Sequence, residues 1–424
     1  MKYIDIIVKK VQQLFKGGFF HIFIGSILVK LIAFFSSIVI VRMVDKSAYA
    51  YLVYADNLYN YALAFAGLGM PSAICKYCAV AKSKDEDRAY LEFALKYGTI
   101  FQILTSCIVV LYVNYFDIAF PEAKGIIYVL FFYPIVSNIL STLMGYVRAH
   151  ENNKLYSKMA VIQTLFIFVG SVVFVNLWGI MGIAGARYIA IIIACGAAFK
   201  FIRQEIEGSR KTKLLKKQKI DFLAMSVSLM VANLFTLIIP MNEMTLVSEL
   251  LRSEIMTANY KVATMIPSQL VFITQSIVIY YFTIIAKMSD KKQIWKLSKK
   301  VGVVTVGIVM AVCLVGILSS PLIIRSVYGN QYADAIRLSS IFWVVYGINA
   351  SIRVLPMNFL PAIGVAKFNA VVSIITCGVH IVLTYWFIST WGVWGAGISA
   401  AIVYSVSAIA YWWYLRKQCL VVER

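Results

Sequence analysis

Six charged residues lie within long apolar runs of this sequence. A charge at the centre of a helix that faces lipid costs about 2.5–3.5 kcal/mol, so most of these side chains must face water or an opposite charge. Cations in a cavity of low dielectric attract anions far more strongly than cations in bulk water do. The pattern therefore predicts the binding of an anion such as a phosphate group. The cations are Lys30, Arg187, Lys261 and Arg353, and the acids are Asp56 and Glu243.

The depth of each charge predicts how the charges pair. Lys30 and Asp56 lie eleven and eight residues into the first two apolar runs, which places both roughly 12–17 Å deep at a rise of about 1.5 Å per residue. A pair between them is feasible, and Glu243 is expected to meet Lys261 in the same way. Both acids are also candidates for carrying a coupling proton, because the charge of a buried carboxyl group responds to burial and to nearby cations.

Two further residues are expected to make contacts near these charges. Arg187 is expected to cap an outer vestibule or to pair with Asp117 or Glu122. His380 is expected to be a hydrogen-bonded contact between helices rather than a proton carrier.

Polar residues repeat at helical spacing beside the charges. One stripe holds Lys261, Thr264 and Ser268, and another holds Asn349 and Arg353. Such stripes predict helix faces that line water. Tyrosine rings and amide groups suit sugars, because a ring stacks on a pyranose face and an amide both donates and accepts hydrogen bonds. The candidates for contacting sugar are Tyr54, Asn57, Tyr61 and Asn349.

The composition is that of a polytopic helical membrane protein. The 424 residues are 61% hydrophobic and 14% charged, with a mean hydropathy of +0.81, whereas a soluble protein holds about 25% charged residues. No long polar segment is available to form a soluble domain. No nucleophile–base pair, metal-ligand cluster or nucleotide-binding loop is present, and Cys75 and Cys78 lack the second pair that a zinc site needs. We therefore expect no enzyme activity and no cofactor.

Cutting the chain at its charged joints predicts an all-α protein with twelve transmembrane helices in two six-helix lobes. Residues 1–18 are expected to form an amphipathic cytoplasmic segment, because apolar and polar side chains recur at helical spacing there. The N-lobe covers 19–202, a basic cytoplasmic linker covers 203–220, the C-lobe covers 221–415, and a cytoplasmic tail covers 416–424. The predicted spans are 19–41, 48–75, 95–116, 126–148, 156–176, 180–202, 221–245, 256–285, 299–320, 336–360, 367–388 and 391–415.

The basic residues predict the orientation of these spans. With the N-terminus inside, the inner segments hold 30 of the 40 Lys and Arg residues, and the outer loops hold six. This bias follows the positive-inside rule and places both termini in the cytoplasm. The net charge of +21 is therefore explained by the membrane topology and by contact with anionic lipid. We expect no nucleic-acid partner.

The sequence repeats itself across its two halves. WGIMG at residues 178–182 and WGVWG at residues 391–395 lie 213 residues apart, and at the same offset Lys154 matches Lys367 and Arg203 matches Arg416. Six spans separate the copies, so both start on the same side of the membrane. A parallel repeat with a pseudo-two-fold axis along the membrane normal is typical of transporters that work by alternating access. Arg187 is not part of the repeat, because Ala400 occupies the matching position.

Several motifs of the chain resemble a known family. Residues 42–79 read RMVDKSAYAYLVYADNLYNYALAFAGLGMPSAICKYCA, residues 325–335 read RSVYGNQYADA, and the WGxxG stretches precede spans six and twelve. In order and spacing they resemble the Wzx-type O-antigen flippases, in the polysaccharide transporter branch of the multidrug/oligosaccharidyl-lipid/polysaccharide exporter (MOP) superfamily. One departure is Tyr49-Ala50, where that family usually has Tyr-Gly.

The resemblance implies a MATE-like, V-shaped pair of lobes with spans 1, 2, 7 and 8 facing a central cavity. It also implies a flippase that moves an oligosaccharide repeat unit on undecaprenyl pyrophosphate from the inner to the outer leaflet of the bacterial cytoplasmic membrane. The cavity cations would attract the pyrophosphate. Coupling to protons or sodium, and partners such as a polysaccharide polymerase and a chain-length regulator, are further expectations.

Two alternatives remain open. A multidrug or cation antiporter of the same superfamily would need an acidic cavity, whereas cations outnumber acids within these spans. A polytopic polysaccharide polymerase or ligase would typically carry a large outer loop, and all outer loops predicted here are short.

Overall fold

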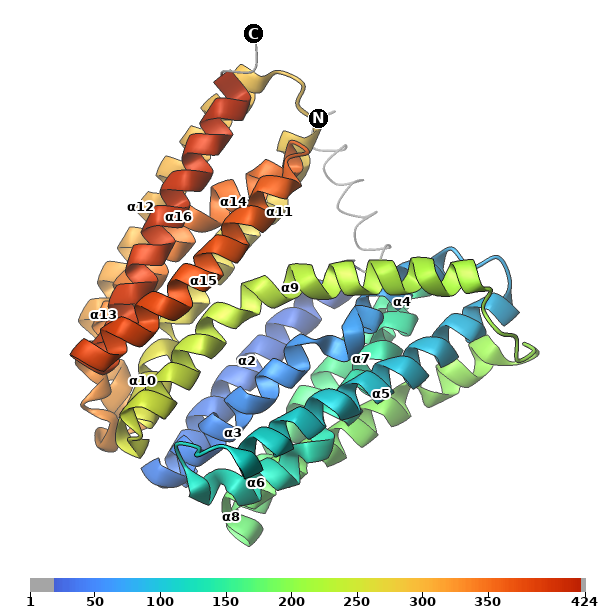
Figure 1. Cartoon of the computed structure of the whole chain (residues 1–424), viewed down its shortest axis with the longest axis horizontal. Helices are drawn as coiled ribbons and strands as arrows, with labels where there is room; N and C mark the ends of the chain where they lie inside the picture. The colour runs from blue at the N-terminus through green and yellow to red at the C-terminus, as the bar shows by residue number, and fades with distance from the viewer. Residues whose placement is uncertain (1–18, 421–424) are drawn as a thin grey trace, which may run out of the picture. The chain divides into compact units, whose positions relative to one another are not determined.

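Helices and turns make up the described part of the chain, residues 19–420 of this computed structural model (Figure 1). Ten helical stretches of it are long and apolar enough to cross a membrane. One of the ten is α8 (Asn153–Ile206), which a break at Trp178 and Gly179 divides in two. α9 (Lys216–Leu251) is not among the ten. The sequence predicts twelve spans. Counting the two arms of α8 separately and adding α9 to the ten stretches gives the same number.

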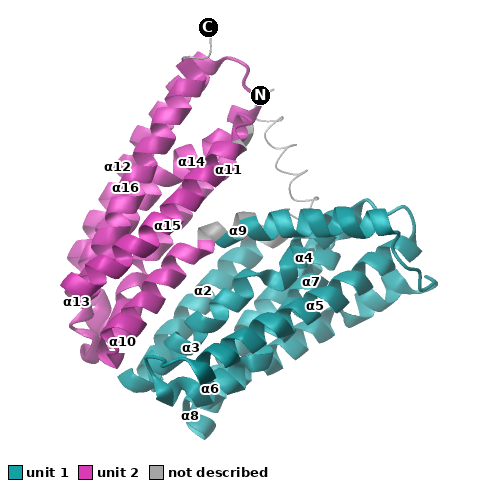
Figure 2. Cartoon of the chain, viewed as in Figure 1, with its two compact units in different colours: residues 1–234 teal, residues 235–424 magenta. Residues whose placement is uncertain are grey.

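The chain forms two compact units, Met1–Leu234 and Phe235–Arg424, and the division falls inside α9 (Figure 2). The predicted basic linker, 203–220, lies within the first unit, and its role as a connection between lobes stays a prediction. The predicted amphipathic segment 1–18 and the last four residues of the predicted tail lie outside the described residues.

Five of the ten stretches, α8 among them, precede α9 in the described part of the first unit. Several of them are assembled from short helices that follow one another directly. In chain order the elements are α2 (Phe19–Met43), α3 (Lys46–Ala64), η1 (Ala66–Gly69), α4 (Met70–Ala79), α5 (Lys84–Tyr115), η2 (Pro121–Ala123), α6 (Lys124–Val129), η3 (Leu130–Phe132), α7 (Tyr133–Ala149) and α8.

The second unit begins within α9 and continues with further helices, several of which are also built from short segments. Pro267, which lacks a backbone N–H, separates two of them. In chain order the elements are α10 (Glu254–Met265), η4 (Pro267–Gln269), α11 (Leu270–Lys287), α12 (Lys291–Ile323), η5 (Ile324–Tyr328), η6 (Asn330–Tyr332), α13 (Ala335–Ile348), η7 (Asn349–Arg353), α14 (Val354–Ala362), α15 (Ala366–Trp391) and α16 (Val393–Leu420).

The repeated WGxxG motif makes the same sharp turn in each unit. Gly179 has φ 55° and ψ −142°, and Gly392 has φ 60° and ψ −145°. A side chain disfavours this region of backbone conformation, whereas glycine enters it readily. The repeat seen in the sequence is therefore also a repeat of local backbone geometry.

The second glycine of each motif lets the two arms of the turn approach each other. A Cβ on Gly182 would lie 2.1 Å from the carbonyl oxygen of Phe174, and one on Gly395 would lie 2.2 Å from that of Phe387. Phe174 and Phe387 are themselves 213 residues apart. Any larger residue would clash with backbone in both copies, so the motif fixes a close helix crossing.

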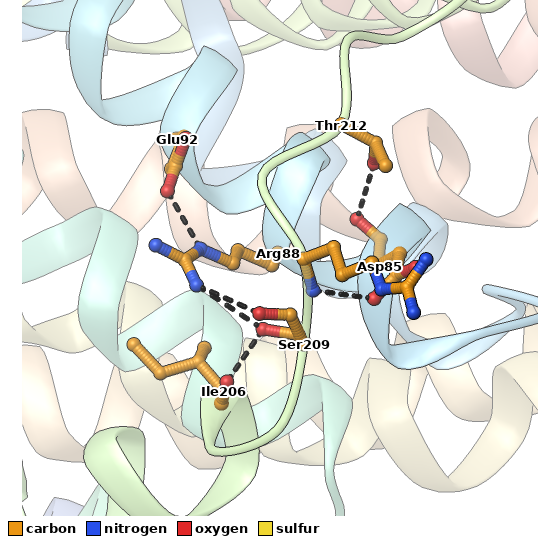
Figure 3. A network of polar contacts seen from close by, with 7 residues as sticks. Asp85, Arg88, Glu92, Ile206, Ser209 and Thr212 are labelled. Atoms are coloured by element: carbon orange, nitrogen blue, oxygen red, sulfur yellow. Dashed lines mark hydrogen bonds and ion pairs between the residues drawn. The ribbon is translucent and has the colours of Figure 1, made fainter.

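The segment between α8 and α9 packs against the first turn of α5 (Figure 3). The backbone N–H of Arg210 donates to Asp85 Oδ1 at 2.7 Å, and Thr212 Oγ1 donates to the carbonyl oxygen of Asp85 at 3.1 Å. Arg88 Nη1 donates to the carbonyl oxygen of Ser209 at 3.1 Å. The acid of α5 therefore accepts from the main chain of this basic segment, and none of the described ion pairs uses the Arg210 side chain.

An apolar anchor completes this contact. Leu214 is 6% exposed and lies in a cluster with Tyr90 and Phe222. The predicted linker is thus tied to α5 by main-chain hydrogen bonds and by one buried leucine.

We expect Gly179→Ala and Gly392→Ala to destabilise the protein by about 1–3 kcal/mol each, because alanine is strained at positive φ. Gly185→Ala and Gly378→Ala are matched controls on α8 and α15, where a new Cβ meets no atom within 4 Å. These helical positions should be neutral or slightly stabilised, by up to about 1 kcal/mol. Thermal unfolding in detergent would test this, and equal melting temperatures for the two pairs would contradict it.

Candidate functional site

The charged pair of the first unit joins α3 to the second arm of α8. Arg187 Nη1 donates to Asp56 Oδ1 at 2.5 Å, and Nη2 donates to Oδ2 at 2.8 Å. The Arg187 guanidinium also lies 5.2 Å from the centre of the Tyr133 ring. The two-pronged geometry is the strongest arrangement available to an arginine and a carboxylate. Asp56 therefore neutralises most of the charge of Arg187.

This pair corrects two predictions. A Lys30–Asp56 pair was feasible from the sequence, and Arg187 was expected to cap an outer vestibule or to pair with Asp117 or Glu122. In the structure both oxygens of Asp56 accept from Arg187 instead, so these pairings are wrong. Depth alone could not choose between two cations at similar levels. The planar guanidinium meets both carboxylate oxygens at once, which an ammonium group cannot do.

The acid of the second unit is almost fully buried. Glu243 on α9 is 1% exposed. Its Oε2 accepts from Tyr260 Oη at 2.6 Å, and its Oε1 lies 3.0 Å from His380 Nε2. Lys261, the partner expected from the sequence, makes neither of these two contacts. The residue before it on α10, Tyr260, donates to the carboxylate instead. His380 is a hydrogen-bonded contact between α15 and α9, as predicted.

Arg353 sits among neutral groups. Its Nε donates to Ser407 Oγ at 2.9 Å, and its Nη1 donates to Asn349 Oδ1 at 3.2 Å. The guanidinium lies 5.3 Å from the centre of the Tyr404 ring. No carboxylate within the described residues forms an ion pair with it. Since these partners leave the positive charge uncompensated, Arg353 is well suited to hold an anion.

The backbone around Arg353 is irregular. Asn349–Arg353 form a π-helical turn, η7, between α13 and α14. Such turns are rare, and they occur frequently at functional sites. The turn also brings Asn349 and Arg353 together, as their spacing in the sequence predicted.

The remaining candidates differ in exposure. Lys30 is exposed on α2, and Lys261 and Tyr61 are half-buried. Tyr54 is fully buried, and its ring packs edge-on against Phe120 at 5.3 Å. Tyr54 therefore offers no free face to a sugar in this conformation, whereas Tyr61 retains an accessible surface.

Sequence reasoning did not find Tyr260, Tyr404 or Ser407. Tyr404 and Ser407 are three residues apart, which places them on one face of α16. That spacing is a usable signal, because a hydroxyl pair is unusual in an apolar run. Tyr260 carries no such signal.

The sequence did not predict a second polar network, which lies at the N-terminal end of α5. Asp87 Oδ2 accepts from Tyr146 Oη at 2.5 Å, and it lies 3.3 Å from Nε2 of His150, in the turn after α7. His150 also lies 4.0 Å from Glu205 on α8. The hydrogen bond to Asp87 raises the pKa of His150 above its ordinary value of 6.5. This network ties three helices together at one end of the first unit.

The chain belongs to the polysaccharide biosynthesis protein family, whose model matches residues 15–285. A protein of Shigella flexneri named "Putative O-antigen transporter" is 24% identical over 117 residues, which are 27% of this chain and 28% of that protein. The matched part thus spans little more than a quarter of that relative.

The fold is that of the MATE transporters. An inward-facing multidrug resistance MATE family transporter of the MOP superfamily matches with a TM-score of 0.75 at 13% identity, over 92% of this chain and 95% of the other. A MOP superfamily transporter from Pyrococcus furiosus, described as having a binding pocket of reverse polarity, matches with a TM-score of 0.64 at 13% identity, over 96% and 95%. A Vibrio cholerae MATE transporter matches with a TM-score of 0.63 at 13% identity, over 100% and 99%. The chain is therefore a member of the polysaccharide biosynthesis protein family that has the fold of the MATE transporters and ten helical stretches able to cross a membrane.

We expect Asp56→Asn to destabilise the protein by about 3–5 kcal/mol, because it leaves the partly buried Arg187 without its anion. The double variant Asp56→Asn with Arg187→Gln should recover part of this loss, since it removes both charges. A double-mutant cycle on thermal unfolding in detergent would measure the coupling between the two side chains. Additive effects of the two substitutions would show that the pair contributes nothing.

His150 should make stability depend on pH. Because folding raises its pKa, its contribution to stability is fully present below about pH 6.5 and is lost as pH rises through the raised value. His150→Gln should melt at a lower temperature than the wild type at about pH 6 and at the same temperature at about pH 9. A constant difference between the two proteins across that range would refute the assignment.

Proposed function

We propose that this protein is a transporter, namely a flippase for an oligosaccharide linked to undecaprenyl pyrophosphate. It would move the lipid-linked repeat unit of O-antigen or a related polysaccharide from the inner to the outer leaflet of the bacterial cytoplasmic membrane. The family match and the name of the Shigella relative support the substrate class. Transport would proceed by alternating access.

The single observation that carries this proposal is the neutral surrounding of Arg353. Its guanidinium is held by an amide, a hydroxyl and an aromatic ring, so its charge remains available to a doubly or triply charged pyrophosphate. Arg187 differs, because two hydrogen bonds to Asp56 already compensate its charge. We therefore assign anion binding to Arg353, together with Lys30 and Lys261, and a supporting role to Arg187.

The sugar portion would contact tyrosine and asparagine side chains. Tyr61 and Asn349 are the best placed of the predicted candidates, since Tyr61 is partly accessible and Asn349 adjoins Arg353. Asn57 and Tyr54 are buried at 5% and 0% exposure. They would contribute only after a change of conformation.

The charge balance disfavours a multidrug antiporter. An acidic site would be needed to attract cationic drugs, and the two intramembrane acids are both engaged, Asp56 by Arg187 and Glu243 by Tyr260 and His380. A polymerase or ligase is the other alternative, and the transporter fold disfavours it. We propose that the chain is not an enzyme.

Several further features belong to the same proposal. The positive-inside distribution supports cytoplasmic termini. The basic segments would contact anionic membrane lipids. Protons or sodium would drive transport, and a polysaccharide polymerase and a chain-length regulator would receive the flipped units.

Removal of the anion-binding cations should abolish export. We expect Lys30→Ala and Arg353→Gln to bind the pyrophosphate about tenfold to a hundredfold more weakly, because each loses a charge-assisted hydrogen bond. In a strain deleted for the gene, these variants should fail to restore surface polysaccharide, although protein levels remain normal. Quantification of surface polysaccharide, with immunoblots of the membrane fraction, would test this.

One control keeps the positive charge at residue 30, and the other tests cationic drugs in place of the lipid-linked sugar. Lys30→Arg should restore most of the export, and resistance to cationic drugs should be the same with and without the gene. Lipid-linked repeat units should accumulate on the inner leaflet of the deletion strain. Normal export by both cation-free variants would rule out the anion-binding role, and a loss of drug resistance without a loss of polysaccharide would favour the antiporter.

A further inference from the structure

The chain makes a left-handed turn between α3 and α4, within the second membrane-spanning stretch. Ala66, Gly67, Leu68 and Gly69 have φ values of 40°, 52°, 62° and 77° in succession. Glycine adopts such values readily, whereas a side chain makes them unfavourable, and residues other than glycine normally visit this region singly. Ala66 and Leu68 are therefore strained. Strain of this kind persists only where the surrounding structure holds it, and it is frequent in segments that switch between conformations.

A buried glutamine of α5 holds this turn. Gln102 is 0% exposed. Its Oε1 accepts from the backbone N–H of Gly67 at 2.9 Å, and its Nε2 donates to the carbonyl oxygen of Ala62 at 2.8 Å. In a continuous α-helix these two backbone groups would bond instead to Leu63 and Ala66, four residues away in each case. One amide thus replaces two helical hydrogen bonds, and it does so only while the helix is broken.

A second buried amide lies against the same turn without a partner. Asn138 on α7 is 4% exposed, and neither its Oδ1 nor its Nδ2 forms a hydrogen bond with any described residue. A Cβ on Gly67 would lie 2.0 Å from Asn138 Oδ1, and one on Gly98 would lie 3.1 Å from Nδ2. The amide therefore fills the space beside the turn. Leaving both of its polar atoms unbonded in an apolar interior is costly.

We infer that the junction of α3 and α4 has two conformations, and that Gln102 and Asn138 each hold one of them. In the present conformation Gln102 bonds to the broken backbone, and Asn138 has no partner among the described residues. In the other conformation Gln102 releases the junction, residues 66–69 leave the left-handed region, and Asn138 bonds to the backbone groups that Gln102 has freed. Relief of the strain and pairing of Asn138 offset the loss of the two Gln102 bonds. An element balanced in this way responds to a small bias.

The helix that runs from one unit into the other can supply this bias. α9 passes directly beside the turn, since a Cβ on Gly69 would lie 2.1 Å from the carbonyl oxygen of Ser226 and 3.1 Å from Cβ of Met230. α9 then continues beyond Leu234 into the second unit (Figure 2). A shift or rotation of α9 therefore displaces the backbone that contacts Gly69. During transport the junction would follow α9. This role rests on the proposed flippase function, whereas the two conformations do not.

Melting temperatures of the purified protein in nanodiscs test the state of Asn138. Asn138→Leu keeps nearly the same shape and removes the unbonded amide, so it should melt about 2–5 °C higher than the wild type. Ser298→Ala, on α12 of the second unit, is the matched control. It removes a buried hydroxyl that also has no partner among the described residues, and it should melt at or slightly above the wild-type temperature. A lower melting temperature for Asn138→Leu would show that the amide is bonded in this conformation and would overturn the inference.

Hydrogen exchange tests the role of Gln102. In Gln102→Leu the N–H of Gly67 loses its acceptor, so the backbone amides of residues 66–69 should exchange at least about tenfold faster than in the wild type. The amides of α7 should keep their rates. Equal exchange at the turn in both proteins would overturn the inference. If either variant does not fold, the other decides by its own criterion.

A cellular measurement separates switching from stability. Asn138→Leu should reduce export of surface polysaccharide by at least about tenfold at equal protein level, although it is the more stable protein, because it favours one conformation over the other. Ser298→Ala should export normally. Export at the wild-type level by Asn138→Leu would overturn the role of the junction in transport and leave the flippase proposal intact. If the wild-type gene itself fails to restore polysaccharide, the flippase proposal is wrong, and the melting and exchange results still decide whether the junction has two conformations.

Discussion

The absence of water from the hydrocarbon interior constrains every polar group of this protein. A charged side chain there must meet an opposite charge, a set of hydrogen-bond partners or a water-filled space. Asp56 and Arg187 meet the requirement with each other, through two parallel hydrogen bonds. Glu243 meets it through a tyrosine and a histidine. Arg353 meets it with neutral groups only. Those three solutions differ in how much charge they leave over, and the proposed anion-binding role of Arg353 depends on the charge that its neutral partners leave over.

The paired glycines explain how the scaffold presents these groups. In each unit one glycine supplies a backbone conformation that other residues avoid, and a second one allows a helix to touch the backbone of its neighbour. Arg187 follows the turn at Gly179 by eight residues, and Ser399 follows the turn at Gly392 by seven. The angle of each turn therefore sets the direction in which these polar side chains enter their unit. A change at the turn would misplace them without touching any charged residue.

The fold was predictable from the sequence, whereas the pairing of the charges was not. Runs of apolar residues, the positive-inside bias and the WGxxG repeat identify the membrane-spanning helices, because length and hydropathy are local properties. Pairing depends on which helices touch and on how each is rotated. Lys30 and Arg187 lie at positions that both suit Asp56 by depth, and only packing distinguishes them. The contact of His380 was predicted, since a histidine in an apolar run needs a partner, but the identity of that partner as Glu243 required the arrangement of α9 and α15. Tyr54 shows a different limit, because its residue type made it a candidate for contacting sugar, whereas packing against Phe120 buries its ring.

The two copies of the repeat share a scaffold but not a chemistry. At the fixed offset of 213 residues, the turn glycines and the crowded phenylalanine carbonyls coincide, yet Arg187 matches Ala400, His380 matches Ile167, and Ser399 matches Ala186. Duplication therefore accounts for the helix crossings and not for the charges. If polar groups served only to hold helices together, both copies would be expected to need them at the same crossings, because the crossings are alike. The uneven distribution instead indicates that the polar groups of the two units have different roles. The first unit holds a neutralised pair, and the second holds a cation among neutral groups and a buried acid that contacts a tyrosine and a histidine.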